Sequence, residues 1–211
     1  MTLRLLSVET TGRSPRARRL VFSDGSERIT SQSVVRKLRL TEGLEIGDAG
    51  SFSADLDACE RSCARQRSFR ALAQREHSRA ELAARLADDG YPAEVAADTL
   101  ESLVRSGLVD DERFAEVWAR SRAHQGFGRR RIGEELARRG IDEELVHTAL
   151  DAIAGDEVTR ARSTLRGPVP TDRKARERVL RRLVGRGFDL PFALRALDAE
   201  PEDETPAQDV S

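Results

Sequence analysis

Two pairs of residues in this sequence have the types and spacing that site chemistry requires. Asp110 and Asp111 are adjacent carboxylates that could hold a metal ion or act as an acid and a base. They stand directly before a segment with helical apolar spacing, where an aspartate caps the helix and its charge suits the N-terminal amides. Cys59 and Cys63 lie four residues apart on an expected helix, where disulfide geometry is poor. We predict a helix cap and two reduced cysteines.

Sequence patterns of known catalytic sites are absent. The chain has no G-x-x-x-x-G-K-S/T, G-x-G-x-x-G, G-x-S-x-G or H-E-x-x-H pattern, and its three histidines lie far apart. The two cysteines have no further pair of ligands at a recognised metal-binding spacing. We therefore predict that the protein is not an enzyme and has no catalytic residue, metal site or cofactor.

Arginine has the most informative placement of any residue type. All but two of the 36 basic residues are arginine, whose forked guanidinium suits phosphate. Arg79, Arg129 and Arg176 each stand eleven residues before a glycine, in the first turn of an expected helix. A cation there opposes the helix dipole by roughly 0.3 to 1 kcal/mol, so its repetition suggests that an anion binds at these helix ends. In the alternative interpretation these side chains are solvated and point away from the helix ends.

The predicted phosphate contacts lie mainly in two basic zones. Residues 119–139 carry a net charge of +5 and residues 158–186 a net charge of +8, although the whole chain has −1. Such zones suit the phosphates of nucleic acid, although a charge run can also be a solvated face. The predicted DNA- or phosphate-binding residues are Arg79, Arg120, Arg122, Arg129, Arg130, Arg131, Arg138, Arg139, Arg173, Lys174, Arg176, Arg178, Arg182 and Arg186. Phe127 could stack on an unpaired base or hold its turn as a hydrophobic staple.

An internal repeat positions these residues. Around Gly90, Gly140 and Gly187, apolar residues recur eight and four positions before the glycine and one, five and ten positions after it. A glycine at this place ends a helix in the left-handed conformation, and the apolar positions on either side predict two helices that pack together. With a further helix before each pair, the sequence predicts three tandem three-helix repeats.

The expected fold is mainly α: tandem three-helix repeats in an elongated, curved array, with a small β-rich N-terminal module. In that module three short strands, two of them joined by the turn at Asp24-Gly25, precede one helix that Ser31 or Ser33 caps and Gly43 ends. The predicted boundaries are residues 1–50 for the module, 51–57 for a linker, 58–107, 108–155 and 156–199 for the repeats, and 200–211 for an acidic, disordered tail.

The most specific sequence motif runs through the second repeat. It begins with Leu108-Val109-Asp110-Asp111-Glu112-Arg113-Phe114 and continues with Gly126-Phe127-Gly128. This order resembles the RecX family, the bacterial modulators of the recombinase RecA, and the resemblance covers roughly residues 60–198. The motif residues are Leu108, Asp110, Asp111, Arg113, Phe114, Gly126, Gly128, Ile132, Leu136 and Gly140.

The resemblance implies a function without catalytic chemistry. Members of the family bind the RecA filament on single-stranded DNA and lie in its helical groove. The chain would then be a modulator, mainly an inhibitor, that suppresses the ATPase and strand exchange of RecA in the regulation of recombination and DNA repair. Its partners would be the RecA filament and the single-stranded DNA within it, with weak binding to DNA alone as an option.

Two other classes of function stay open. A free-standing nucleic-acid-binding protein with a helix-turn-helix would bind DNA tightly without a partner. In a purely protein-binding helical scaffold, removal of the arginine zones would change the binding function little. No stretch approaches the roughly 20 apolar residues of a membrane span, and Met1 to Val8 is too short for a signal peptide. We therefore expect a soluble, cytoplasmic monomer without membrane contact.

Overall fold

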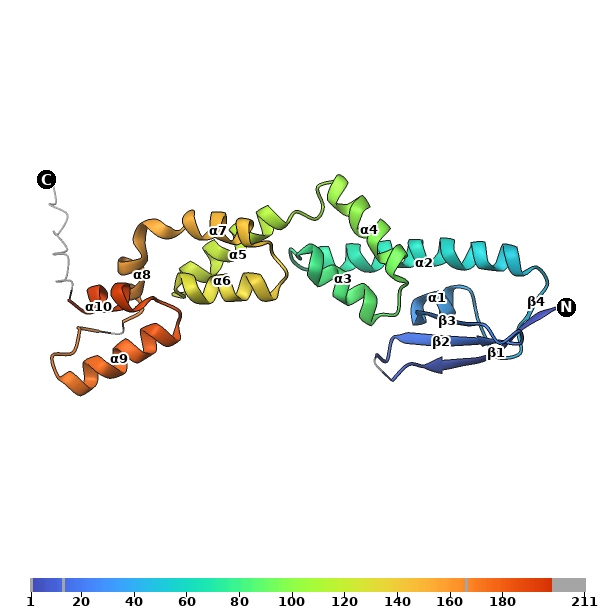
Figure 1. Ribbon diagram of the computed structural model, residues 1–211, viewed down its shortest axis with the longest axis horizontal. Helices are drawn as coiled ribbons and strands as arrows, with labels where there is room; N and C mark the ends of the chain where they lie inside the picture. Colours follow the sequence, from blue (N-terminus) through green and yellow to red (C-terminus); the bar gives the residue numbers. More distant parts are fainter. Residues whose placement is uncertain (1, 13, 166, 199–211) are drawn as a thin grey trace, which may run out of the picture. The chain divides into compact units, whose positions relative to one another are not determined.

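The computed structural model describes residues 2–12, 14–165 and 167–198, except the side chain of Asp156. Within these residues the chain forms ten α-helices and four β-strands (Figure 1). It divides into two compact units: the first comprises Met1–Phe114 with Arg139–Ile141, and the second comprises the other described residues. The predicted fold class, tandem three-helix domains with a small N-terminal sheet, is confirmed. The elongated, curved arrangement stays a prediction, and the predicted tail over 200–211 lies outside the described residues.

The N-terminal module is one antiparallel sheet with a short helix. Its strands, in the order β3-β2-β1-β4, are β1 (Leu3–Thr10), β2 (Ala17–Phe22), β3 (Glu27–Ser31) and β4 (Glu45–Ile46). The turn between β2 and β3 forms as predicted, since the Asp24 carboxylate accepts from the Ser26 amide and Gly25 has a φ of 83°. β4 was not predicted, because two residues are too few to show an alternating pattern.

The helix of this module, α1 (Gln32–Lys37), is shorter than predicted. Ser31 caps it by accepting a hydrogen bond from the Ser33 amide. The sequence placed its end at Gly43, but the helix stops at the cap residue Leu38. Arg39 takes the left-handed conformation there, with a φ of 52°, and Gly43 lies in the following turn before β4. The prediction was wrong because a glycine signals a turn without specifying which turn.

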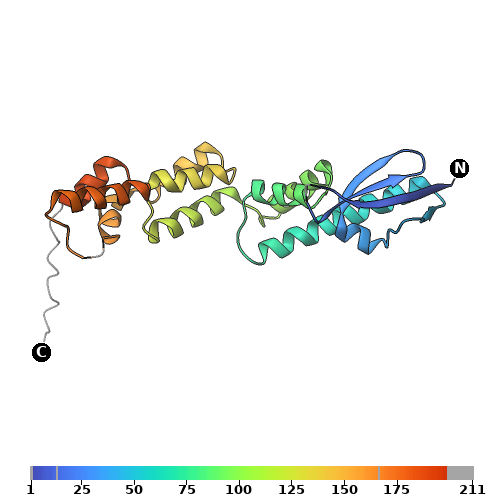
Figure 2. The same ribbon diagram turned by 90° about the horizontal axis from the view of Figure 1, so that it is seen from below.

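The predicted linker over residues 51–57 is part of the long helix α2 (Ala49–Leu72). Asp48 caps this helix by accepting from the Ser51 amide at 2.8 Å. Glycine, serine and aspartate in its first turns favour a linker locally. Tertiary packing overrides that preference, because Leu56 is buried in one core with residues of the sheet and Phe52 packs against that core. Figure 2 shows α2 running along the strands of the module.

A buried polar cluster also fixes α2 to the sheet. The Glu60 side chain on α2 has no exposed surface, and its carboxylate accepts hydrogen bonds from Arg28 at 2.6 Å and from the Thr30 hydroxyl at 2.7 Å. Arg28 and Thr30 both belong to β3. A buried carboxylate is stable only when it is paired in this way, so the cluster specifies how helix and sheet align.

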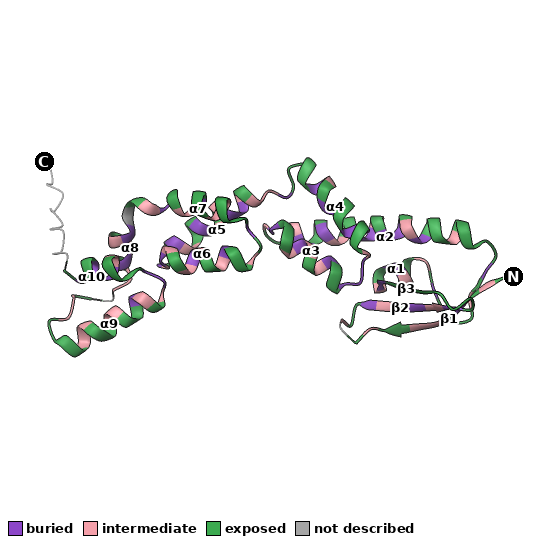
Figure 3. Cartoon of the chain, in the orientation of Figure 1, coloured by how far each residue is buried: buried purple, intermediate pink, exposed green. Residues whose placement is uncertain are grey.

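Each three-helix repeat follows the predicted glycine register. The first uses α2, α3 (Arg79–Asp88) and α4 (Ala93–Arg105); the second uses α5 (Asp111–His124), α6 (Arg129–Arg138) and α7 (Glu143–Asp151); the third uses α8 (Glu157–Ser163), α9 (Arg173–Gly185) and α10 (Leu190–Asp198), after the 3-10 turn η1 (Ala154–Asp156). Gly90, Gly140 and Gly187 have φ values of 88°, 73° and 90°. The apolar positions before them are buried, as the purple segments of α3 and α6 show (Figure 3), except that Val179 is half-buried.

The three register glycines also permit close contact with the part of the fold that precedes each repeat, which is the β module for Gly90 and the previous repeat for Gly140 and Gly187. A Cβ atom on Gly90 would lie 2.7 Å from the Ala17 Cβ, and one on Gly140 would lie 2.4 Å from the Ala80 Cβ. On Gly187 it would lie 2.3 Å from the Arg131 Cβ. Glycine is therefore required at these positions both by its φ angle and by the space available.

At the same contacts, donors at the start of one helix form hydrogen bonds with carbonyls at the end of another. In the second unit the Gly128 amide donates to the Arg186 carbonyl at 3.0 Å, and the Arg130 amide donates to the Gly187 carbonyl at 3.2 Å. In the first unit the Ser78 hydroxyl donates to the Arg139 carbonyl at 2.7 Å. The first amides and last carbonyls of a helix have no partner within that helix, so these contacts compensate both ends at once.

We expect Leu136→Ala to lower the free energy of unfolding by about 2 to 5 kcal/mol, because it leaves a cavity at a fully buried position of α6. Urea denaturation of the full chain, followed by circular dichroism, measures the change. Val117→Ala is the control, since Val117 is 49% exposed on α5. Similar losses for the two variants would contradict the assigned core.

We expect Gly187→Ala to destabilise the second unit. A residue with a Cβ loses about 1 to 2 kcal/mol in the left-handed conformation, and the clash with Arg131 adds to that loss. Gly185→Ala, two residues earlier in α9, is the matched control because a Cβ there meets nothing within 4 Å. The melting temperature should fall for Gly187→Ala and rise for Gly185→Ala, since alanine at a compatible position stabilises by about 0.4 to 1 kcal/mol. Equal melting temperatures would refute the close contact at Gly187.

Candidate nucleic-acid interface

The protein itself supplies anions at two of the helix ends where the sequence suggested a phosphate. The Asp111 carboxylate accepts from the Arg79 amide at 2.8 Å, at the start of α3. The Glu157 carboxylate, which is buried, accepts from the Arg129 amide at 3.1 Å, at the start of α6. These carboxylates lie at the beginning of the next repeat's first helix. The anion that suits each helix start is therefore a carboxylate of the next repeat. The sequence did not predict these contacts, because the two residues of each pair are about 30 positions apart.

We call Arg79, Arg129 and Arg176 the arginine column, and in the second and third repeats its members have acidic partners. The Arg129 guanidinium forms an ion pair with Asp151 at 2.8 Å, and Arg176 forms one with Asp198. Asp151 and Asp198 each stand eleven residues after the register glycine. The column therefore links the start of the middle helix to the end of the third helix in the same repeat. Arg79 is exposed and has no ion pair among the described residues.

The motif Asp110-Asp111 acts at two helices rather than one. Asp110 caps α5 as predicted, since its carboxylate accepts from the Arg113 amide at 3.0 Å. Asp111, by contrast, reaches the start of α3. The Arg113 side chain binds the Glu76 carboxylate at 3.1 Å, while Phe114 is buried. The contacts of this part of the motif therefore connect the start of α5 with the start of α3 and the segment before it.

Most other motif residues are structural as well. Gly126 has a φ of 77° in the turn before α6, and a Cβ on Gly128 would lie 2.3 Å from the Gly187 backbone. Ile132 and Leu136 are fully buried. Leu108 differs from them because its side chain is 46% exposed, so it is the motif residue that packing explains least.

Phe127 lies at the centre of an arginine cluster in the second unit. The guanidinium carbons of Arg122, Arg131 and Arg186 lie 4.0, 4.7 and 5.8 Å from its ring centroid. Guanidinium groups in such positions are attracted to the ring face. These groups compete with a base for the ring, and both base stacking and the hydrophobic staple stay predictions for Phe127.

Glu135 holds this arginine cluster together. Its carboxylate accepts from Arg122 Nε and Nη2 at 2.7 and 2.6 Å, from Arg131 at 3.2 Å and from the Trp118 indole at 3.3 Å. Burial acts to raise the pKa of Glu135, but the hydrogen bonds from Arg122 and Arg131 outweigh it, so the pKa is lowered. Glu135 is therefore ionised near neutral pH and neutralises part of the cluster's charge.

Several other predicted phosphate contacts are also engaged within the chain. Their partners are carboxylates or backbone carbonyls: Arg120 with Glu116, Arg130 with Glu134 and the Val184 carbonyl, Arg138 with the Glu134 carbonyl, Arg139 with Glu81, Arg173 with Glu177, and Arg186 with the Gly126 carbonyl. An arginine that is already paired has fewer donors and less uncompensated charge left for a phosphate. These residues are therefore weaker candidates than their number in the sequence suggested.

One face of α9 carries cations with no such partner. Lys174, Arg178 and Arg182 are exposed on successive turns, and Arg181 is exposed beside them. The side chains of these four residues form no hydrogen bond or ion pair with another residue in the described part of the chain. Arg181 was missing from the predicted set, although its position seven residues after Lys174 places it on this face. We call these four residues the α9 basic face.

Other site chemistry receives little support. The described histidine, cysteine, aspartate and glutamate residues do not gather in groups of three or more that could hold a metal. Cys59 and Cys63 are free and buried, with their sulfurs 4.0 Å apart, and burial raises the pKa of Cys59 to about 11. Among the described helices, none combines the length and apolarity needed to cross a membrane.

Comparison with known proteins identifies the family. Sequence models of the first and second three-helix domains of RecX match residues 64–103 and 110–150. The regulatory protein RecX of Mycolicibacterium vanbaalenii is 42% identical over 154 residues, which are 67% of this chain and 84% of the relative. The chain belongs to the RecX family. The RecX of Halorhodospira halophila is 40% identical over 144 residues, covering 66% of this chain and 89% of that protein.

Solved RecX structures share the fold. A crystal structure of regulatory protein RecX has a TM-score of 0.61 and 20% identity, and the match covers 93% of this chain and 100% of that one. RecX from Lactobacillus salivarius gives a TM-score of 0.61 and 17% identity over 67% of this chain and 96% of its own. The tandem three-helix arrangement is thus the fold of this RecX-family regulatory protein.

We expect Asp111→Ala to lower the free energy of unfolding by about 1 kcal/mol, because it leaves the Arg79 amide at the start of α3 without its acceptor. Asp111→Asn keeps an acceptor oxygen and should recover part of the loss. Asp98→Ala, at an exposed position of α4, is the control. Chemical denaturation checks the order, and an Asp111→Ala variant as stable as the control would show that the cap contributes nothing.

Proposed function

We propose that this RecX-family protein is a modulator, mainly an inhibitor, of the recombinase RecA and has no catalytic chemistry of its own. It binds the RecA filament on single-stranded DNA and suppresses the ATPase and strand exchange of RecA. The observation that carries this proposal is the 42% identity to a regulatory protein RecX over 84% of that relative. The site of action is the cytoplasm, and the active species is a monomer.

The α9 basic face supports contact with the DNA of the filament. α9 contains six basic residues and one acidic residue, and four of the basic ones form the exposed face. Cations that bind phosphates release counterions from the nucleic acid, which strengthens binding at low salt. Because these four side chains have no competing carboxylate, they are better phosphate donors than the paired arginines of α6.

The acidic zone around α4 supports a separate contact with protein. Residues 81–118 carry a net charge of −7, and Glu94, Asp98 and Glu101 are exposed on one face of α4. Such a surface repels DNA phosphates and attracts basic protein surfaces. We assign this α4 acidic face to RecA and the α9 basic face to DNA, so the two charge zones of the chain have different partners.

We expect substoichiometric amounts of the protein to lower the ATPase rate of the same organism's RecA on single-stranded DNA. The test combines this assay with the double variant Arg178→Ala/Arg182→Ala, which removes two cations one turn apart on the α9 basic face. That variant should inhibit less and should lower the salt slope of DNA binding by up to roughly 0.7 per lost phosphate contact. Melting temperatures close to the unaltered chain would show that folding is retained.

The matched control is Arg61→Ala/Arg65→Ala, which removes two exposed arginines one turn apart on α2. It should leave inhibition and the salt slope unchanged. If the folded, unaltered protein does not affect the ATPase but binds DNA tightly by itself, the function is that of a free-standing nucleic-acid binder. If inhibition is unchanged in both double variants, the protein acts as a scaffold through protein contacts alone.

A further inference from the structure

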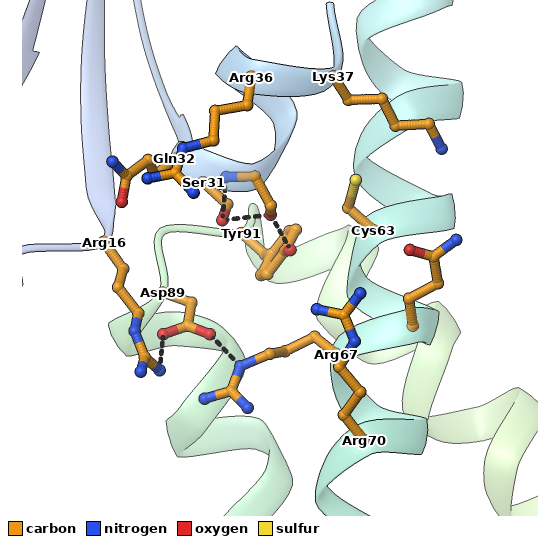
Figure 4. Close-up of a pocket in the computed structure, with 12 residues that line it drawn as sticks. Arg16, Ser31, Gln32, Arg36, Lys37, Cys63, Arg67, Arg70, Asp89 and Tyr91 are labelled. Atoms are coloured by element: carbon orange, nitrogen blue, oxygen red, sulfur yellow. Dashed lines mark hydrogen bonds and ion pairs between the residues drawn. The ribbon is translucent and has the colours of Figure 1, made fainter.

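A basic pocket lies in the first unit, between the β module and α2. Its volume is about 530 Å³, within the roughly 300 to 1,000 Å³ of small-molecule sites. Five basic side chains line it, namely Arg16, Arg36, Lys37, Arg67 and Arg70, and Asp89 is its one lining carboxylate (Figure 4). The charged lining therefore has a net charge of +4. We call this site the basic pocket.

Part of the lining is held in place by partly buried contacts. The Asp89 side chain is 8% exposed and binds both Arg16, which precedes β2, and Arg67 on α2 (Figure 4). At the base of the pocket, the Ser33 hydroxyl lies 2.8 Å from the hydroxyl of the buried Tyr91. Because these contacts join the sheet, α1, α2 and the end of α3, the pocket has a defined shape without a ligand.

The remaining three cations have no carboxylate partner among the described residues. The Lys37 ammonium donates to the Ser62 hydroxyl at 3.0 Å. Arg36 has the neutral amide of Gln32 beside it, with 3.1 Å between Arg36 Nη2 and the amide oxygen when that oxygen faces it. Arg70 is exposed and has no ion pair within the described ranges. Elsewhere in this unit, arginines such as Arg28 and Arg113 are paired with acidic residues.

We propose that the basic pocket binds a ligand through phosphate groups. Like charges gathered around one concave site repel each other, and a phosphate with its multiple acceptor oxygens relieves that repulsion. Forked guanidinium groups with a nearby ammonium are the donors that such oxygens prefer. The phosphates come either from a small diphosphate or triphosphate or from consecutive nucleotides of a single strand. The site does not depend on the RecA proposal, because RecA contributes no residue to it.

The test measures binding of two probes to the full chain without RecA. Inorganic pyrophosphate, titrated calorimetrically, represents the small ligand, and a fluorescent oligothymidylate, followed by anisotropy, represents the strand. Arg36→Glu and Arg70→Glu each reverse a charge at an exposed lining position. Each should weaken binding of at least one probe by about tenfold or more, as expected for loss of a charge-assisted contact. Loss with pyrophosphate identifies a small ligand, and loss with the oligonucleotide alone identifies a strand.

Arg65→Glu is the matched control, because it reverses an exposed charge on the same helix outside the pocket. It should change binding of either probe by much less than the two pocket variants. The proposal is overturned if the unaltered protein binds neither probe, or if all three variants weaken binding equally, which would indicate a general charge effect. Since Arg36 and Arg70 are exposed, melting temperatures equal to that of the control confirm that each variant is folded.

Discussion

The structure depends on how the polar ends of its helices are satisfied. Each α-helix leaves amides at its start and carbonyls at its end without partners. Here the end of one repeat's middle helix meets the start of another, as where the Gly128 amide donates to the Arg186 carbonyl. The backbones approach this closely because Gly187 lacks a Cβ. A carboxylate from the next repeat accepts a hydrogen bond from a further amide at the helix start, as Asp111 and Glu157 do.

This requirement also determines how the charges of the chain are used. A large share of the arginines and carboxylates form contacts between helices, such as the pair of Arg129 with Asp151 and the cluster around Glu135. A high content of arginine is therefore not in itself a measure of nucleic-acid binding. The informative cations are those without an acidic partner that lie close together, as on the α9 basic face and around the basic pocket. These two places lie in different units.

The acidic motif shows how the same residues serve fold and family identity. Asp110 caps its own helix, whereas Asp111 caps a helix of the preceding repeat. Neither residue needs catalytic chemistry to explain its place in the motif. Phe127 is similar, because the guanidinium groups of Arg122 and Arg131 cover its ring. The motif that identifies the RecX family is thus largely a description of the joints between repeats.

The sequence by itself determined the repeats, their register glycines and the cap at Asp110, because helix periodicity and the left-handed glycine are local properties. It also identified the family, through a motif whose residues stand close together in the chain. Only the tertiary structure decided that residues 51–57 are helical, since the packing of Leu56 on the sheet outweighs weak local preferences. It also decided which cations are available, because Arg36 and Arg70 meet at one pocket although they are far apart in sequence. Charge pairing depends on distance in space, which the linear order of residues does not contain.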